Sequence, residues 1–312
     1  GRHIVFALHG WLDNAMSFAP LANALAQDDL TIIALDFAGH GHSAHRPCAS
    51  GYHFSDYLRD VILAADYLGI QRLDLLCHSM GAAVATLLAG AFPEHVVRLA
   101  CIELYGVASV SDDEPLPQRF RNNLMQLDYM QSRPEKVYQD FDALMRARLS
   151  AGEMRAENAA LLLSRNTSKG YEGYRFLSDR RLRIWQPNLL SEAQMMSFIE
   201  AIEAPVLMIE AEQGYAPHWA FLPPRYAATR DIQVQRLTGA HHVHMDAPLA
   251  VAACLRDFSR RRPRDMNRDN ICFMTSKPSC AIACVSARFC MMMDWLSSIY
   301  ALNLILKLIT MK

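Results

Sequence analysis

Short apolar runs alternate with stretches of helical periodicity over most of the chain. The six runs that read as strands are residues 3–8, 30–36, 73–77, 96–103, 205–211 and 232–237. Helical patterns connect them at residues 17–26, 55–68, 79–92 and 246–258, the second opening with Ser55 as a predicted N-cap. Continuous apolar strands of this length indicate a parallel sheet that is buried on both faces. The alternation therefore predicts an α/β fold with a doubly wound, mostly parallel sheet.

The alternation is interrupted between residues 107 and 203, which are more polar and predict helices at 134–149, 152–164 and 191–202. A helical insertion between two strands of one sheet is typical of a cap or lid over the edge where ligands bind. A structural subdomain with no role in access is the alternative. We therefore expect a core of residues 1–106 and 204–262 and a helical cap of residues 107–203.

Residues 263–312 differ in composition from the rest, with four cysteines and no glycine. We interpret them as an atypical tail, disordered or an artefact of the gene model, in preference to an amphipathic membrane-surface helix. The cysteine spacings of this tail match no familiar zinc pattern. The other cysteines form no CxxC pair, which predicts reduced thiols and a cytoplasmic protein. The chain starts directly on an apolar strand, so we expect a truncated N-terminus from which a targeting segment could have been lost.

The charge and the apolar content of the chain limit the kinds of partner that we expect. The net charge is −1, which gives no indication of nucleic-acid binding. No apolar run is long enough for a convincing membrane span. We expect a small-molecule substrate and no cofactor, and the oligomeric state is not predicted.

The stretch "CHSMG" carries the clearest chemistry, because Ser79 lies between a predicted strand and a predicted helix. This is the setting of a nucleophile elbow, in which a sharp turn presents the serine hydroxyl and the next N–H, that of Met80, can bind an oxyanion. Gly81 fills one of the two flanking positions where glycine is usual, but Cys77 stands at the other. A buried polar strand end is the alternative interpretation.

Two further loops follow predicted strands. "HGW" ends the first, and in such an architecture the N–H of Trp11 is the expected second oxyanion donor, with His9 as a structural loop residue. "DFAGHGHS", from Asp36 to Ser43, follows the second strand, and its glycines allow a loop to pass close to the site.

These motifs, together with "TGAHHVHM" from Thr238 to Met245, occur in the order found in the α/β-hydrolase superfamily. The segments "HGWLDNAMSFAPLANAL" and "GAHHVHM" most resemble its serine hydrolase-like branch. The resemblance covers about residues 3 to 260. The family's fold normally has two strands before the one at residues 3–8, and their absence here predicts an exposed edge of the sheet or a truncated gene model.

The resemblance implies a catalytic histidine in the loop after the last strand. Three histidines lie there, His241, His242 and His244. His241 matches the catalytic position best, and His244 matches a supporting histidine of the branch. Many family members carry an Asp at the position near Gly214, where this chain has none. The other location known in the superfamily follows the strand after the nucleophile helix, and there the chain has Glu103. An unpaired carboxylate in such an apolar run is costly, so Glu103 is favoured over Glu212.

The sequence thus predicts a serine hydrolase that cleaves a carboxylic ester of a small or medium apolar substrate, with Ser79, His241 and Glu103 as a triad and Trp11 and Met80 as oxyanion donors. One alternative is a catalytically inactive binding protein of the same fold. The least favoured is a metal-dependent hydrolase using the histidines of residues 39–45 and 241–244, because no familiar ligand pattern is present and we predict no metal site.

Overall fold

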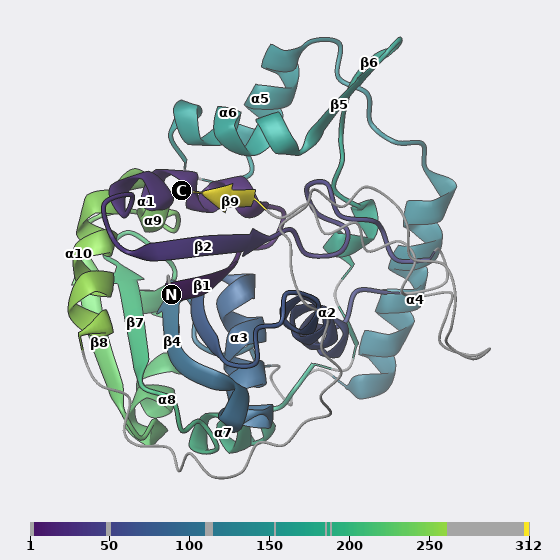
Figure 1. Cartoon of the computed structure of the whole chain (residues 1–312). Helices are drawn as coiled ribbons and strands as arrows, with labels where there is room; N and C mark the ends of the chain where they lie inside the picture. Colours follow the sequence, from purple (N-terminus) through teal and green to yellow (C-terminus); the bar gives the residue numbers. More distant parts are fainter. Residues whose placement is uncertain are drawn as a thin grey trace, which may run out of the picture.

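The computed structural model describes residues 3–47, 51–109, 115–152, 154–184, 186–187, 189–260 and 309–311. Its centre is a sheet with the strand order β8-β7-β4-β3-β1-β2-β9 (Figure 1). The strands are β1 (His3–Leu8), β2 (Leu30–Leu35), β3 (Leu73–His78), β4 (Val96–Ile102), β7 (Val206–Ala211), β8 (Ile232–Leu237) and β9 (Ile309–Met311). All neighbouring pairs from β8 to β2 are parallel, and β9 is antiparallel to β2. The six strands expected from the sequence are therefore present, with bounds within one residue, in a mostly parallel sheet.

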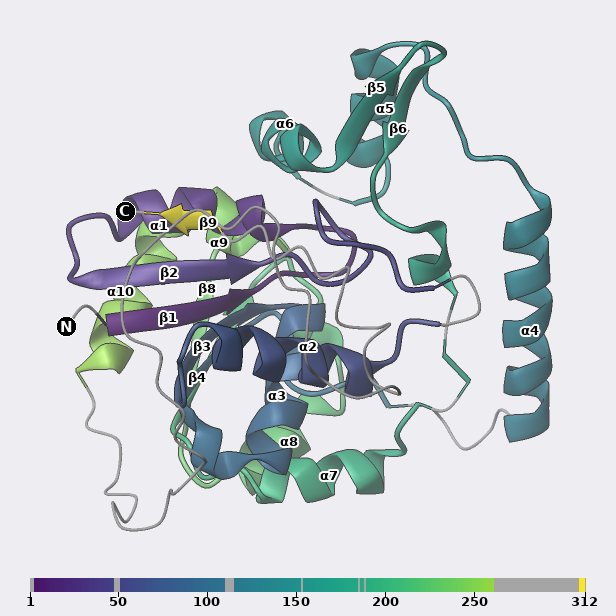
Figure 2. The same ribbon diagram turned by 45° about the vertical axis from the view of Figure 1, so that its right-hand side comes forward.

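Helices cover both faces of this sheet (Figure 2). On one face, α2 (Phe54–Tyr67), α3 (Met80–Ala91), α7 (Glu192–Glu200) and α8 (Leu222–Ala228) bury side chains such as Phe6, Leu75 and Leu99. On the other, α1 (Ala19–Ala24), α9 (Val243–Asp246) and α10 (Pro248–Ser259) bury the alternate residues, among them Ala7 and Leu76. Because successive strand residues point to opposite faces, this double burial explains the continuous apolar strand sequences.

The cap consists of α4 (Leu116–Ser132), α5 (Phe141–Leu149), α6 (Ala156–Arg165) and a hairpin of β5 (Thr167–Gly170) and β6 (Gly173–Phe176). Figure 2 shows these elements beyond the ends toward which β1 and β2 run. Trp11, in the loop after β1, contacts the segment that follows β6, because its indole Nε1–H donates to the carbonyl of Leu182, 2.9 Å away. The insertion of residues 107–203 therefore contacts the edge of the sheet at which ligands bind in this class of fold.

The expected helix at residues 134–149 is wrong in its first half. The helix begins only at Phe141, and the preceding Tyr138 is hydrogen-bonded to Tyr174 of β6 in an isolated bridge. Asp140 caps α5 by accepting from the N–H of Ala143. The helix α4 and the hairpin β5–β6 were not predicted, since both are polar and their pairing depends on neighbours within the cap.

Two other local expectations need correction or detail. The N-cap of α2 is His53 and not Ser55, and it makes no side-chain cap bond. The helix at residues 191–202 is present as α7, with Ser191 and Gln194 forming a capping box. It packs closely on α3, since a Cβ on Gly90 would lie only 2.5 Å from the carbonyl oxygen of Phe198.

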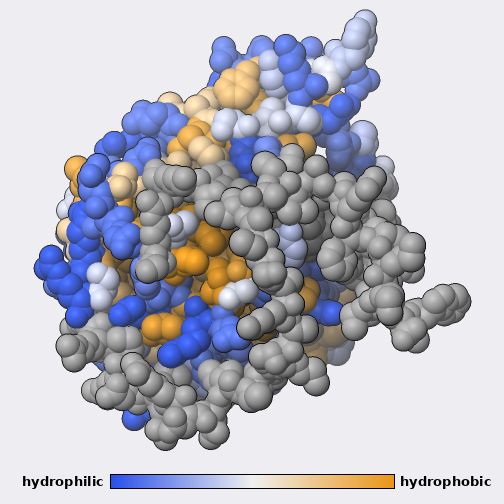
Figure 3. Space-filling model, in the orientation of Figure 1, coloured by the Kyte–Doolittle hydropathy of each residue, from blue (hydrophilic) through white to orange (hydrophobic). Residues whose placement is uncertain are grey.

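The sequence predicted an exposed edge of the sheet, because two strands that usually precede the one at residues 3–8 are missing. Residues Ile32–Ala34 of β2 pair with β9. Figure 3 shows apolar side chains gathered near the centre of this view, over the region of β2, with polar residues around them. The rest of the predicted tail lies outside the described residues. Among the helices that the structure describes, none has the length and hydropathy needed to cross a bilayer.

Candidate active site

Ser79 occupies the sharp turn between β3 and α3. Its backbone has φ 50° and ψ −120°, a left-handed conformation that costs energy in a residue with a side chain. The N–H of Ser79 donates to the carbonyl of Ile102 at 2.9 Å, which fastens the turn to β4. A Cβ on Gly81 would lie 2.1 Å from the carbonyl oxygen of Leu8, so only glycine fits there. The turn is thus built as the sequence motif predicted.

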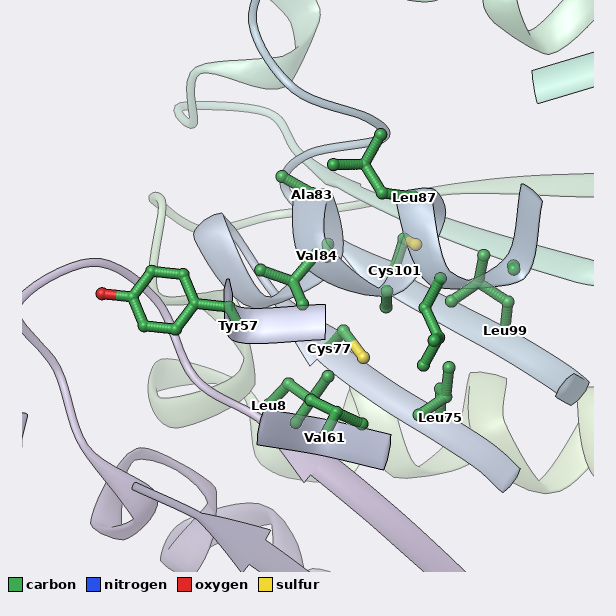
Figure 4. Packing of buried hydrophobic residues seen from close by; sticks show 14 of the residues in the cluster. Leu8, Tyr57, Val61, Leu75, Cys77, Ala83, Val84, Leu87, Leu99 and Cys101 are labelled. Carbon is green, nitrogen blue, oxygen red and sulfur yellow. The ribbon is translucent and has the colours of Figure 1, made fainter. Parts of the chain in front are cut away.

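Cys77, the departure from the usual motif, does not disturb this turn. It is a residue of β3 with no exposed surface, and its side chain lies in the core among Leu8, Val61 and Val84 (Figure 4). It does not line the cavity above Ser79. Burial raises the pKa of the Cys77 thiol well above its ordinary value, so this sulfur is a packing group and not a second nucleophile.

His241 lies between Ser79 and Glu103, in the loop after β8. Its Nε2 is 3.0 Å from Ser79 Oγ, and its Nδ1 is 3.1 Å from Glu103 Oε2. The ring also packs against Tyr215, with centroids 4.6 Å apart. The three predicted residues therefore form one continuous chain of hydrogen bonds.

Glu103 is fully buried directly after β4, again with a left-handed backbone (φ 63°). Its Oε1 accepts from the N–H of Ala211 and its Oε2 from the N–H of Tyr215, each at 2.7 Å. Because backbone N–H groups can only donate, the carboxylate is held as an acceptor. Glu212, the other candidate, is exposed and accepts from Thr238.

Gly214 lies directly beside the Glu103 carboxylate. A Cβ on Gly214 would be 2.1 Å from Oε2 and 2.5 Å from Oε1. The side chain of Glu103 thus fills the space that a carboxylate at position 214 would need. The two acid locations considered from the sequence are alternative routes to one place in the fold.

This geometry selects one tautomer of His241. The carboxylate of Glu103 can only accept, so Nδ1 carries the proton and Nε2 presents its lone pair to the Ser79 hydroxyl. That is the arrangement in which an imidazole can remove the serine proton and the carboxylate can stabilise the resulting imidazolium.

The two predicted oxyanion donors, Met80 and Trp11, line the same cavity as Ser79. Met80 is the first residue of α3, where backbone N–H groups have no partner within the helix. Neither backbone N–H has a hydrogen-bond partner among the residues that the structure describes. Both remain available to a ligand.

The loops beneath the site are held by structural hydrogen bonds. His9 donates from Nδ1 to the carbonyl of Gly10 at 2.7 Å and accepts at Nε2 from Phe37 N–H at 3.0 Å, as expected for a structural residue. Burial lowers its pKa. Asp36 accepts from the N–H of Ala15 and from Arg165 of α6, both at 2.8 Å, and so joins the core to the cap.

A cavity of about 540 Å³ opens above Ser79 between the core and the cap. This is within the size range of small-molecule sites. Apolar side chains dominate its lining, including Phe54 and Leu104 of the core and Val107, Phe176, Leu182, Ile184 and Leu189 of the insertion. An insertion that supplies half of this wall helps to determine which substrates fit.

Sequence reasoning missed the group of residues behind the triad. Asp13 accepts from His242 Nε2 at 3.0 Å and from Arg148 of α5, also at 3.0 Å. Burial alone would raise the pKa of Asp13, but His242 and Arg148 hold it well below its usual value. Burial and the neighbouring histidines lower the pKa of His78, which precedes Ser79, well below its ordinary value. The only sequence signal was the position of these residues inside the three motifs.

His244 belongs to the same group. It is fully buried, packs on His78 with centroids 4.2 Å apart, and burial lowers its pKa to about 3. Neither of its ring nitrogens has a described hydrogen-bond partner. It supports His78 by packing and makes no hydrogen bond to His241.

Residues 3–248 match the model of the alpha/beta hydrolase fold family. The chain belongs to this family and is a hydrolase by class. Within the superfamily it falls in the serine hydrolase-like branch. It is 29% identical to a serine hydrolase-like protein of Danio rerio, over 88% of this chain and 86% of the relative. It is 30% identical to serine hydrolase-like protein 2 of Homo sapiens, over 81% and 86%.

Solved structures agree on the fold. A hypothetical protein of Pseudomonas aeruginosa PAO1 superposes with a TM-score of 0.78 at 38% identity, covering 84% of this chain and 92% of that one. A thioesterase domain from the curacin biosynthetic pathway superposes with a TM-score of 0.73 at 24% identity, covering 82% and 91%. At that identity the second likeness concerns the fold alone.

Proposed function

We propose that this protein is a serine hydrolase that cleaves carboxylic esters through an acyl-enzyme. The observation that carries the proposal is the hydrogen-bonded series Ser79–His241–Glu103 at the floor of the cavity, with distances of 3.0 and 3.1 Å. Each member has the neighbour that its role requires, and the strained backbone of Ser79, for which Gly81 makes room, is of the kind found at functional sites.

In the proposed first step, His241 Nε2 takes the proton of Ser79 and the serine oxygen attacks the ester carbonyl. The N–H groups of Met80 and Trp11 bind the oxyanion that develops. The imidazolium, stabilised by Glu103, then protonates the departing alcohol. Water enters, loses its proton to His241 and releases the acid, which restores Ser79.

The cavity supports a small or medium apolar substrate. Its volume of about 540 Å³ and its mostly apolar lining favour burial of an acyl or alkyl group. The alternative, an inactive binding protein of the same fold, is disfavoured by the intact hydrogen bonds of His241, which a ligand-binding site does not need.

The test is covalent labelling of the full chain with a fluorophosphonate, followed by intact mass measurement and by hydrolysis of p-nitrophenyl butyrate. Ser79→Ala should abolish both labelling and turnover. Ser178→Ala is the matched control, because Ser178 is a buried serine that lines the same cavity and should leave labelling intact. An unlabelled wild-type chain, or a Ser79→Ala chain that is still labelled, would refute the proposal.

A further inference from the structure

Three buried side chains meet directly behind the proposed triad. Asp13 follows β1, His78 immediately precedes Ser79, and His242 immediately follows His241. One ligand atom from each of Asp13, His78 and His242 lies within 4.8 Å of the others. Their side chains are 2%, 1% and 11% exposed, yet all three reach the wall of the cavity. Two imidazoles and a carboxylate are thus gathered in a place that a small solute can reach.

The hydrogen bonds of His78 leave one of its nitrogens unpartnered in this group. Its Nε2 lies 2.9 Å from the carbonyl oxygen of His241, and since a carbonyl only accepts, Nε2 carries the proton. In the neutral ring Nδ1 is therefore a bare lone pair. It is buried without a described partner and faces Asp13 Oδ2 at 3.7 Å. Two acceptors that face each other in a low-dielectric interior repel unless a cation or a proton donor lies between them.

His242 provides the third atom. Its Nε2 lies 3.0 Å from the same Oδ2, while its Nδ1 is buried and has no described partner. If a cation replaces the proton on Nε2, that proton can move to Nδ1, so the ring stays neutral and ligates through Nε2. The ring can therefore change from a hydrogen-bond donor into a metal ligand without any rearrangement of the chain.

We propose that Asp13 Oδ2, His78 Nδ1 and His242 Nε2 bind one divalent transition-metal ion, with zinc the ion that two imidazoles and a carboxylate suit best, and that the bound ion inhibits hydrolysis. In a tetrahedral zinc site with bonds near 2.1 Å, neighbouring ligand atoms lie about 3.4 Å apart. The separations of 3.7 and 3.0 Å from Asp13 Oδ2 to the two nitrogens bracket that value. Three protein ligands leave one position for water on the side of the cavity.

This site differs from the one considered from the sequence. That hypothesis joined the histidines of residues 39–45 to those of residues 241–244. Among the described residues, none of the former belongs to a group with metal-ligand geometry. The carboxylate that the sequence pattern lacked comes from Asp13, in the loop after β1.

Inhibition, which rests on the proposed function, follows from the position of the site. The rings of His78 and His242 lie 4.7 and 5.4 Å from that of His241. An ion held by both would lie at the wall of the cavity that Ser79 and His241 also line, where an ester must approach Ser79. It would also restrain the residues adjacent in sequence to Ser79 and to His241.

Arg148 provides an opposing charge and so a sharper test. Its Nη2 lies 3.0 Å from Asp13 Oδ1, on the other oxygen of the same carboxylate. The guanidinium already neutralises much of the negative charge that a metal ion needs. Arg148→Gln should therefore tighten metal binding, an effect that a merely structural role for the group does not predict.

Binding is measured on the full chain after chelator treatment, with the metal ions alone as probes. Titration with Co²⁺ should produce the visible absorption of a tetrahedral site, and calorimetry with Zn²⁺ should give one ion per chain. His242→Gln and Asp13→Asn should each weaken binding by about 100-fold or more, and thermal melting shows whether each variant is folded. His95→Gln is the control, because this histidine lies away from the cavity on Gln71 and should leave the affinity unchanged.

The outcomes separate the parts of the proposal. No stoichiometric binding, or equal Zn²⁺ affinity for wild type and folded His242→Gln, would overturn the site. Zn²⁺ should also slow ester hydrolysis reversibly in wild type and not in any active His242→Gln enzyme, and binding without such slowing would overturn the inhibition alone. Failure of fluorophosphonate labelling would count against the hydrolase and leave the metal measurement interpretable.

Discussion

We predict that the acid of the proposed triad can be transferred from position 103 to position 214, because the two positions lie next to each other in the fold. A Cβ on Gly214 would lie 2.1 Å from Glu103 Oε2, and Gly214 does not have the positive φ that would exclude a side chain. An aspartate at position 214 therefore fits only when the side chain of Glu103 is removed. Glu103→Gly is the suitable background, because glycine tolerates the φ of 63° at this position.

The expected loss of turnover in Glu103→Gly follows from the hydrogen bonds that the carboxylate accepts. Removing it leaves His241 Nδ1–H and the N–H groups of Ala211 and Tyr215 without their acceptor. Loss of the acid of a serine triad costs about 10⁴-fold in turnover when the histidine then adopts the wrong tautomer, equivalent to roughly 5.4 kcal/mol of activation free energy. We expect a loss of that order in Glu103→Gly.

The pair of substitutions should be strongly non-additive. Gly214→Asp alone places a second carboxylate against the first in a buried space, so it should destabilise the chain and reduce activity. In the Glu103→Gly background the same change should recover turnover by at least about tenfold, because the two residues share one place. Gly214→Asn in that background is the control of equal size without charge, and it should not recover activity.

The assay is kcat/KM for p-nitrophenyl butyrate, with thermal melting to confirm that each variant is folded. Two results would refute the reasoning. One is a folded Glu103→Gly/Gly214→Asp chain that is no faster than Glu103→Gly. The other is a Gly214→Asp single variant that is as stable and active as wild type, which would show that the two side chains do not compete for one space.

Three further predictions concern the surroundings of the site. Cys77→Gly restores the usual elbow residue. It should lower the free energy of unfolding, measured in urea, by about 1–3 kcal/mol, because it leaves a cavity and adds backbone freedom. It should not raise kcat. Gly81→Ala should prevent folding or abolish turnover, because its Cβ would lie 2.1 Å from the carbonyl oxygen of Leu8; an active, stable variant would disprove that contact. The pKa of buried His244 falls to about 3, so its contribution to stability is present above the unfolded pKa near 6.5 and is lost as the pH falls toward 3. His244→Phe should reduce that pH slope by about 1.4 kcal/mol per unit, and unchanged slopes between pH 6 and 4.5 would contradict it.

The sheet was predictable because its strands carry their own signal. Strands buried on both faces are mostly apolar. Leu73–His78 and Val206–Ala211 fit this description without any knowledge of their neighbours, although they include Asp74, His78 and Glu210. The inserted residues between β4 and β7 were less predictable. Its helix α4 and hairpin β5–β6 are polar, and the extended residues before α5 depend on the pairing of Tyr138 with Tyr174. Such pairing between distant residues has no local pattern.

The same difference separates the triad from the cluster behind it. Ser79 and His241 stand in motifs whose spacing reports a turn or a loop, so the local sequence indicates their place. Asp13, His78 and His242 stand inside the same motifs, but their meeting depends on the end of β3 and the loops after β1 and β8, which converge at one edge of the sheet. Each motif contains one of these three residues. Only the fold shows that His78 and His242 both face the same carboxylate oxygen, Oδ2 of Asp13.

Glu103 falls between these cases and shows why the acid was the hardest member of the proposed triad to place. Its apolar surroundings in "LACIELYG" indicated a partner but not which one. The fold supplies the answer through the backbone: the positive φ of Glu103 turns the side chain out of the strand and toward the loop after β7, where the N–H groups of Ala211 and Tyr215 converge. Ala211 ends β7 and Tyr215 lies in the loop that carries Gly214, so both donors are close to the place where a carboxylate at position 214 would lie. We therefore expect the end of β7 and the following loop to determine where the proposed acid lies, and the residue that reaches this place to be exchangeable without a change in the chemistry proposed at His241.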